Sequence, residues 1–239
     1  MGPVSNRPYQ PGRLETGPTT DPPAALEPHM SDIPLTLFAV HLSGGVMAMP
    51  WVVGGFVGAA ALVAVACWRL PESHVPRIGV LSAAFFVASS VALPLALLPT
   101  TVHPILNGLV GVCLGWRAPL AIAVGLCLHL FLLAHGGLDS LGLNTCIMAL
   151  PAVAVAAVHP VLRRLGVTAF ARGVLLGGGA VAGAALLNYL VLLLGGVDDW
   201  TTLARLVLLA HVPVVLIEGF LVGVMVSYVE KVKPDLLAG

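Results

Sequence analysis

The sequence predicts an all-α fold, a polytopic bundle of about seven transmembrane helices. Three observations lead to this class. Hydrophobic residues make up 58% of the 239 residues and charged residues only 9%, whereas soluble domains carry roughly 45–50% and about 25%. The hydrophobic residues are gathered in runs long enough to cross a bilayer, and basic residues stand between alternate runs. We therefore expect a multi-pass protein of the cell inner (plasma) membrane.

The elements follow in order along the chain. Residues 1–33 are rich in Pro, Gly and Thr and have no apolar period, so we expect a disordered tail. Residues 34–46 are expected to form an ordered segment, 47–230 the transmembrane domain, and 231–239 a cytoplasmic tail. The predicted spans are 47–67, 78–98, 104–115, 119–134, 141–162, 173–194 and 203–229. A span needs about 20 residues, so the third is expected to be a partial helix whose backbone is buried in protein.

The charges between the spans predict an orientation. With seven spans, eight basic residues fall on one side of the membrane: Arg69, Arg77, Arg117, Arg163, Arg164, Arg172, Lys231 and Lys233. The opposite breaks, at 99–103, 135–140 and 195–202, contain no Lys or Arg. By the positive-inside rule, the amino terminus is extracytoplasmic and the carboxyl terminus cytoplasmic.

Charge, cysteines and missing motifs exclude several classes of protein. Eleven Lys and Arg residues balance eleven Asp and Glu residues, which excludes a nucleic-acid binder built on a basic patch. The four cysteines form no C-x-x-C pair, so neither a zinc knuckle nor a disulfide framework is expected. The sequence contains neither H-E-x-x-H nor G-x-x-x-x-G-K-[ST], the motifs of helical metalloproteases and of P-loop ATPases.

Histidines at the outer ends of the spans are the candidate metal ligands. His41, His103 and His135 lie near those ends, and His129 precedes His135 on the fourth span. Ionisable residues at membrane depth are costly and usually functional, and imidazole suits Ni, Co, Cu and Zn. We predict metal ligation by His41 and His103, with His129 and His135 as weaker candidates. The alternative is a set of ordinary interfacial histidines.

The last span carries a second polar pair. His211 and Glu218 are seven residues apart and share one helix face. Glu218 lies about 15 residues into this span, roughly 23 Å from its outer end at 1.5 Å per residue. We therefore expect Glu218 to be a structural anchor rather than a metal ligand. His74 and His159 adjoin cytoplasmic breaks and are expected to be solvated.

Small residues in the first span indicate a close helix contact. Gly54, Gly55, Gly58 and Ala59 follow small-x-x-x-small spacing, which lets two helices approach closely. Internal packing and docking of a partner membrane subunit both remain open.

Four segments carry a resemblance to a known family. They are VHLSGGVM at 40–47, TVHPILNG at 101–108, the series His129, GGL at 136–138, LGLN at 141–144 and Met148, and HVPVVLIEG at 211–219. In order and spacing these segments resemble MHIPDGFL, SGHLLGG, Q…DGGL…LGAN…M and HLPLALIEG of the CbiM/NikM family. Members of this family are the substrate-capture permeases of cobalt and nickel energy-coupling factor transporters. Asn144 is grouped with His211 and Glu218 as an expected structural polar residue.

The resemblance implies a transport subunit with no enzymatic activity of its own. It implies a second transmembrane coupling subunit, a cytoplasmic ATPase pair and a small accessory membrane subunit as partners. The transported Co²⁺ or Ni²⁺ would be a substrate, with no permanent cofactor. In the family the metal is held at an outer pocket by the terminal amine, the next amide nitrogen and two imidazoles. By position the imidazoles are His41 and His103, and residues 34–46 would enter that pocket.

The chain departs from the family at this amino-terminal site. Because 39 residues precede Val40, no free amine stands there. Gly44, His129 and His135 replace an Asp, a Gln and an Asp of the family. Either the tail is removed, or another ligand completes the site, or metal affinity is lost. The alternatives are a membrane scaffold or degenerate paralogue without metal binding, a permease for a different small solute and, least favoured, an intramembrane enzyme.

Overall fold

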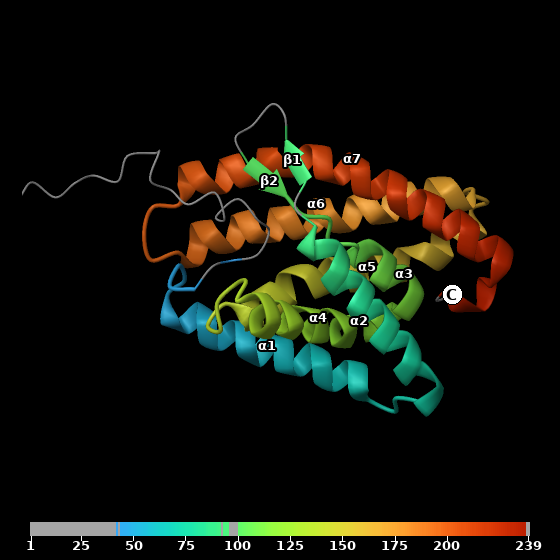
Figure 1. The fold of residues 1–239 in the computed structure, drawn as a ribbon, viewed down its shortest axis with the longest axis horizontal. Coiled ribbons are helices and arrows are strands. Elements are labelled where there is room, and N and C mark those ends of the chain that lie inside the picture. The colour runs from blue at the N-terminus through green and yellow to red at the C-terminus, as the bar shows by residue number, and fades with distance from the viewer. Residues whose placement is uncertain (1–41, 43, 92, 96–99, 238–239) are drawn as a thin grey trace, which may run out of the picture. The chain divides into compact units, whose positions relative to one another are not determined.

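The helices follow the apolar runs of the sequence, and proline and glycine set many of their ends (Figure 1). The computed structural model describes residues 42, 44–91, 93–95 and 100–237, so the predicted tail at 1–33 and most of 34–46 lie outside the described residues. The described α-helices are α1 (Met49–Cys67), α2 (Val75–Ser90), α3 (Asn107–Leu114), α4 (Ala118–Leu133), α5 (Leu141–Arg164), α6 (Ala169–Gly195) and α7 (Thr201–Val232). Short 3₁₀ turns, η3 (Glu72–His74), η4 (Gly115–Arg117) and η5 (Pro234–Leu236), precede α2, join α3 to α4 and follow α7.

Proline and glycine mark helix ends for physical reasons. A proline stands in the first turn of α1, α2 and α4, where its missing N–H leaves no hydrogen bond unmade. After α3 the chain turns at Gly115, whose φ of 63° lies in the left-handed region, where a residue with a Cβ is strained. This turn ends α3 after eight residues and starts α4 in a new direction.

The expectation of an all-α fold is wrong at one place in the described chain. α2 ends at Ser90, short of the predicted Leu98, and a short antiparallel pair follows, β1 (Leu93–Leu95) with β2 (Thr100–Val102). The physical reason is Pro94, because proline cannot continue a helix and disfavours the helical conformation of the residue before it. The apolar run is therefore longer than the helix it forms.

The number of helices that could cross a membrane is smaller than predicted. Five stretches of the described residues are long and apolar enough: Met49–Cys67, Asn107–Leu133, Leu141–Arg164, Ala169–Gly195 and Thr201–Val232. α2 has only 16 residues, and α3 and α4 make one continuous apolar stretch although Gly115 turns the chain between them. The described chain is a multi-pass helical membrane protein.

α5 is the central helix, and α1, α3, α4 and α6 all pack against it. Gly55 and Gly58 of α1 face α5, because a Cβ added to them would lie 2.6 Å from Leu143 Cγ and 3.0 Å from Cys146 Sγ. Gly54 faces open space, and Ala59 is half-buried. Gly55 and Gly58 thus lie in the contact with α5, whereas Gly54 lies on the outer face of α1.

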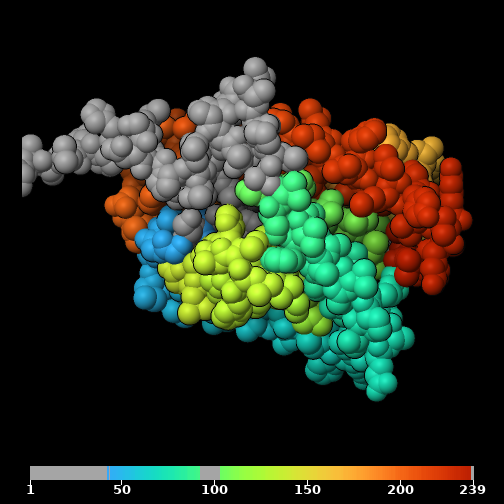
Figure 2. Space-filling model, in the orientation of Figure 1, coloured from blue at the N-terminus to red at the C-terminus, as the bar shows by residue number. Residues whose placement is uncertain are grey.

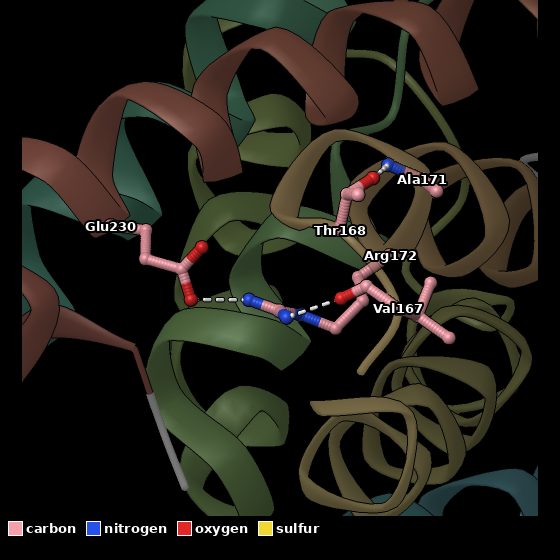
Figure 3. Close-up of polar contacts among 5 residues, drawn as sticks. All are labelled: Val167, Thr168, Ala171, Arg172 and Glu230. Carbon is pink, nitrogen blue, oxygen red and sulfur yellow. Dashed lines mark hydrogen bonds and ion pairs between the residues drawn. The ribbon is translucent and has the colours of Figure 1, made fainter. Parts of the chain in front are cut away.

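α6 and α7 form the closest helix pair, running side by side in Figure 1. A Cβ added to Gly173 would lie 2.6 Å from the Cα of Gly223, so glycine is needed for the two backbones to meet. At the end of this pair, Arg172 forms an ion pair with Glu230 and donates a hydrogen bond to Val167 O at 2.7 Å (Figure 3). The side chain of Arg172 is only 5% exposed, so this ion pair ties two helices together largely out of solvent.

Hydrogen bonds also join breaks that are far apart in sequence. Arg117 donates to Arg69 O at 3.5 Å, and Arg77 donates to Cys113 O at 3.0 Å and to Leu236 O. Arg69, Arg77 and Arg117 belong to breaks with predicted basic charge, Cys113 lies in the last turn of α3, and Leu236 belongs to the segment after α7. We call the region where these residues meet the basic end of the helices.

Elsewhere in the fold, backbone hydrogen bonds join segments that contain no basic residues. Ala48 N donates to Gly195 O at 2.8 Å, and Val197 N donates to Val46 O at 3.0 Å. The segment before α1 is therefore bonded to the turn between α6 and α7.

Candidate metal site

Asn144 fixes the backbone of the segment that leads into α1. Leu42 N donates to Asn144 Oδ1 at 2.7 Å, and Asn144 Nδ2 donates to Leu42 O at 3.0 Å. Ser140 Oγ donates to the same Leu42 carbonyl at 2.7 Å. Asn144 and Ser140 are buried on the first turn of α5 and the residue before it, so they hold Leu42, the residue directly after His41, against α5.

A second contact fixes the turn that follows Leu42. Gly45 N donates to Asp139 Oδ2 at 2.7 Å, and Gly45 has a φ of 79°, a conformation that favours glycine. A Cβ on Gly44 would lie 2.9 Å from Asp139 Oδ1 and 3.4 Å from Gly137 Cα. The close approach of the loop between α4 and α5 therefore explains the small residue at 44, where the resembling family has an aspartate.

Three of the four predicted histidine ligands lie in a row beside this loop. The rings of His103 and His135 have their centroids 5.8 Å apart, and those of His135 and His129 are 5.9 Å apart. His129 Nε2 is hydrogen-bonded to Ser89 Oγ at 2.7 Å, and its ring meets the ring of Phe86 edge-on at 5.0 Å. His103 comes from the loop after β2, His135 follows α4 and His129 lies on α4, so distant segments bring these imidazoles together.

The surroundings of His103 favour the neutral form of its imidazole. Partial burial and the neighbouring His135 lower the pKa of His103 from its ordinary value of 6.5, while backbone carbonyls of Ser89 and Val91 act in the opposite direction. Its Nδ1 is buried and has no hydrogen-bond partner among the described residues. A neutral imidazole is the form that binds a metal.

No single group of three metal-ligating side chains is formed by the described residues alone. Among them, no set of three or more His, Cys, Asp or Glu side chains converges closely enough to hold a metal ion. His41 lies outside the described residues. The row His103–His135–His129 is therefore a series of neighbouring imidazoles, and a complete ligand set needs a further contribution.

Glu218 holds the loop that carries His103. It is fully buried on α7 and accepts hydrogen bonds from Ile105 N and from Leu106 N, the latter at 2.9 Å to Oε2 and 3.0 Å to Oε1. Leu106 has a φ of 54°, in the left-handed region, and is the residue before α3. The carboxylate thus lies at the amino-terminal end of α3, where the helix dipole favours negative charge.

This contact corrects the predicted separation of Glu218 from the site. The sequence estimate, roughly 23 Å, assumed that His103 lies level with the outer end of α7. Ile105 and Leu106, which bond to Glu218, are two and three residues after His103, and each residue spans at most about 3.6 Å. Because α2 ends early, the loop turns back beside α7 and brings His103 close to Glu218.

The other predicted polar residue of α7 bonds within its own helix. His211 is buried, and its Nδ1 donates to Val207 O at 2.6 Å.

His159 does not match the expectation that it is solvated: it is fully buried on α5, on the same face as Ala152, Val155 and Ala156. The basic residues that follow it misled the prediction, because α5 remains packed up to its last turn.

Sequence reasoning missed several residues that shape this site. Asn107 is fully buried and donates to Met148 O at 3.2 Å and Ala180 O at 3.3 Å, which joins α3 to α5 and α6. Asp139, Ser140 and Ser89 were also assigned no role. Asn107 belongs to the 101–108 segment, and its position at the start of a helix was the sequence signal that could have identified it.

Solved structures with this arrangement of helices are known. Two are described as crystal structures of transition metal transporters, one of them truncated. The match to the truncated protein has a TM-score of 0.70 and 20% identity over 80% of this chain and 98% of that chain. The second match has a TM-score of 0.71 and 22% identity, and it covers 80% of this chain and 93% of that chain. At this level of identity the likeness concerns the fold, which is that of a multi-pass membrane protein.

The family to which the chain belongs defines it as a membrane transport component. The chain belongs to the CbiM family, described as the cobalt uptake substrate-specific transmembrane region, whose sequence profile matches residues 41–236. This family consists of transport components and not of enzymes. The resemblance seen in the four sequence segments is thereby confirmed.

Named relatives cover most of this chain. A provisionally named metal transport protein of Haemophilus influenzae is 35% identical over 204 residues, which are 83% of this chain and 97% of the relative. The cobalt transport protein CbiM of Sorangium cellulosum is 30% identical over 213 residues, which are 83% of this chain and 94% of the relative.

Proposed function

We propose that this chain is the substrate-binding membrane subunit for uptake of a divalent transition metal, cobalt or nickel. The observation that carries the proposal is the contact of Leu42 with Asn144 and Ser140. It holds the residue after His41 on the same loop and helix that carry His135, next to His103. The family and the names of its relatives supply the chemical class of the substrate.

His41 and His103 are the proposed ligands of the transported ion. Imidazole nitrogens suit Co²⁺ and Ni²⁺, and the neutral state favoured at His103 leaves one ring nitrogen with a free lone pair. His135 and His129, which replace an Asp and a Gln of the family, extend the set of imidazoles next to His103. The metal is the substrate of this protein and no resident cofactor is proposed.

The energy for uptake comes from separate subunits in this proposal. The chain has no P-loop motif, so we propose an energy-coupling factor ABC transporter with a second membrane subunit, a cytoplasmic ATPase pair and a small accessory membrane subunit. The proposed location is the plasma membrane.

The proposed topology has seven passages with the amino terminus outside and the carboxyl terminus inside. The hydrogen bonds at the basic end support it, because Arg69, Arg77, Arg117 and the segment after α7 meet there. Under the positive-inside rule this basic end is cytoplasmic.

The test is metal titration of the full chain and of a chain whose tail has been removed to start at Val40, with amino-terminal sequencing of the mature protein. We expect one Co²⁺ or Ni²⁺ to bind per chain, with higher affinity when Val40 carries a free amine. Absence of binding in both forms of the folded protein would contradict the proposal and favour a membrane scaffold. Binding of a different solute would favour a permease of other specificity.

A further inference from the structure

A cavity of about 460 Å³ lies at the basic end of the helices. α2, α3, α7 and η5 line it, and in Figure 2 the green atoms of α3 show between the teal of α2 and the red of α7. Apolar side chains form most of its wall, among them Leu81, Leu109 and Met225. Its volume falls within the range of about 300–1,000 Å³ that ligand pockets occupy.

The cavity opens sideways, toward the surface that faces lipid. Val80 of α2 and Tyr228 of α7 stand on its wall and are 69% and 66% exposed. In a multi-pass membrane protein, exposed apolar side chains on the outer faces of helices contact acyl chains. Tyrosine is enriched where acyl chains meet headgroups, so the position of Tyr228 fits the edge of the hydrocarbon region.

The cation of Arg77 stands at the end of this apolar cavity. The guanidinium of Arg77 lines the cavity, and its hydrogen bonds go to the backbone carbonyls of Cys113, Asp235 and Leu236. Across residues 44–91, 93–95 and 100–237, the ion pair found is that of Arg172 with Glu230. Within this part of the chain, no carboxylate therefore lies within ion-pair distance of Arg77.

We propose that this cavity binds one anionic glycerophospholipid, with an acyl chain between α2 and α7 and the phosphate beside Arg77. The apolar cavity, which opens to the bilayer, suits the acyl chain of such a molecule. The guanidinium of Arg77 at the end of the cavity suits its phosphate. Basic pockets between transmembrane helices on the cytoplasmic side bind anionic headgroups in this way. The bound lipid would stiffen the contact between α2, α7 and the segment after α7.

The test is native mass spectrometry of the full-length chain, without metal, titrated with phosphatidylglycerol or phosphatidylcholine. We expect one bound phosphatidylglycerol and about fivefold weaker binding of phosphatidylcholine, the ratio that one surface cation contributes at ~1 kcal/mol. Val80→Trp should fill the cavity and reduce lipid binding, whereas Val87→Trp, at a 60% exposed position of α2 outside the cavity, should not.

A pair of substitutions at Arg77 isolates the role of charge. Arg77→Lys and Arg77→Gln both lose the fork of the guanidinium that reaches the carbonyls, and only lysine keeps the positive charge. We expect Arg77→Lys to keep the preference for phosphatidylglycerol and Arg77→Gln to lose it. Equal binding of the two lipids by the unaltered protein, equal effects of Val80→Trp and Val87→Trp, or a protein subunit retained in the cavity instead of lipid would each overturn the proposal. Because no metal is used, failure here leaves the metal-uptake proposal unaffected.

Discussion

Asn144 shows how one side chain can order a segment that has no regular secondary structure. Its amide group offers an acceptor and a donor, and both are used on the single residue Leu42. A buried backbone group without a partner costs about 1–3 kcal/mol, so the two bonds strongly favour one position of this segment. The arrangement ties the start of the described chain to α5, the helix against which most others pack.

At the residue scale, we predict that His103→Ala weakens binding of Co²⁺ or Ni²⁺ by more than about 100-fold. Loss of a direct ligand should exceed the 10–100-fold effect typical of outer-shell changes. Calorimetric titration of the purified chain measures the affinity. His74→Ala is the matched control, because His74 is only half-buried and precedes α2 at the basic end. His159 is unsuitable as a control since it is fully buried. Equal affinities of the His103 and His74 variants would refute the ligand assignment.

At the element scale, α7 holds the loop before α3 through Glu218. We predict that Glu218→Leu lowers the yield of folded protein, because the amides of Ile105 and Leu106 lose their acceptors at about 1–3 kcal/mol each. Glu218→Gln retains one acceptor oxygen and should keep both folding and metal binding. Size-exclusion chromatography and metal titration provide the two readouts. Leu216→Ala, at a 70% exposed position of the same helix, serves as the control. Loss of metal binding in well-folded Glu218→Gln protein would show that the carboxylate's charge is needed at the site.

The ion pair between α6 and α7 gives a second prediction at this scale. Glu230→Leu should destabilise the protein by about 3 kcal/mol, at the low end of the range for a broken buried pair because Glu230 is 34% exposed. It leaves the buried guanidinium of Arg172 without its counter-ion. The double variant Arg172→Met, Glu230→Leu should recover most of this loss. Thermal unfolding in detergent is the measurement, with Glu72→Gln at an exposed position as control. If the double variant is no more stable than Glu230→Leu, the explanation by an unpaired charge fails.

The helices themselves were largely predictable from the sequence, and their connections were not. Runs of apolar residues located α1, α4, α5, α6 and α7 to within a few residues. Hydropathy alone could not end α2 at Ser90, since the apolar run continues and only Pro94 signals the strand pair. The sequence selected His103, His129 and His135 as candidates, but their side-by-side placement depends on contacts between distant segments. The hydrogen bond from Gly45 N to Asp139 likewise joins distant segments, and no local sequence pattern indicates it.

At the scale of the whole molecule, contacts between breaks sort the chain into groups that match its charges. Breaks that carry Arg69, Arg77 and Arg117 are hydrogen-bonded to one another or to the segment after α7. The segment before α1 is bonded instead to the breaks after α4 and α6, which lack basic residues. This grouping is the one that alternating passages through a bilayer require.

The topology prediction follows from this grouping. A reporter fused after Lys233 should be active in the cytoplasm, and one fused before the first helix should be active only outside it, because the basic breaks are retained on the cytoplasmic side. Activity of each fusion in intact cells, with enzymes that function on only one side of the membrane, is the measurement. Fusions within the breaks at 70–74 and 99–103 should report opposite sides, since α2 is the helix that separates them. Should both report the same side, α2 would not cross the membrane, and the five-span reading would replace the seven-span one.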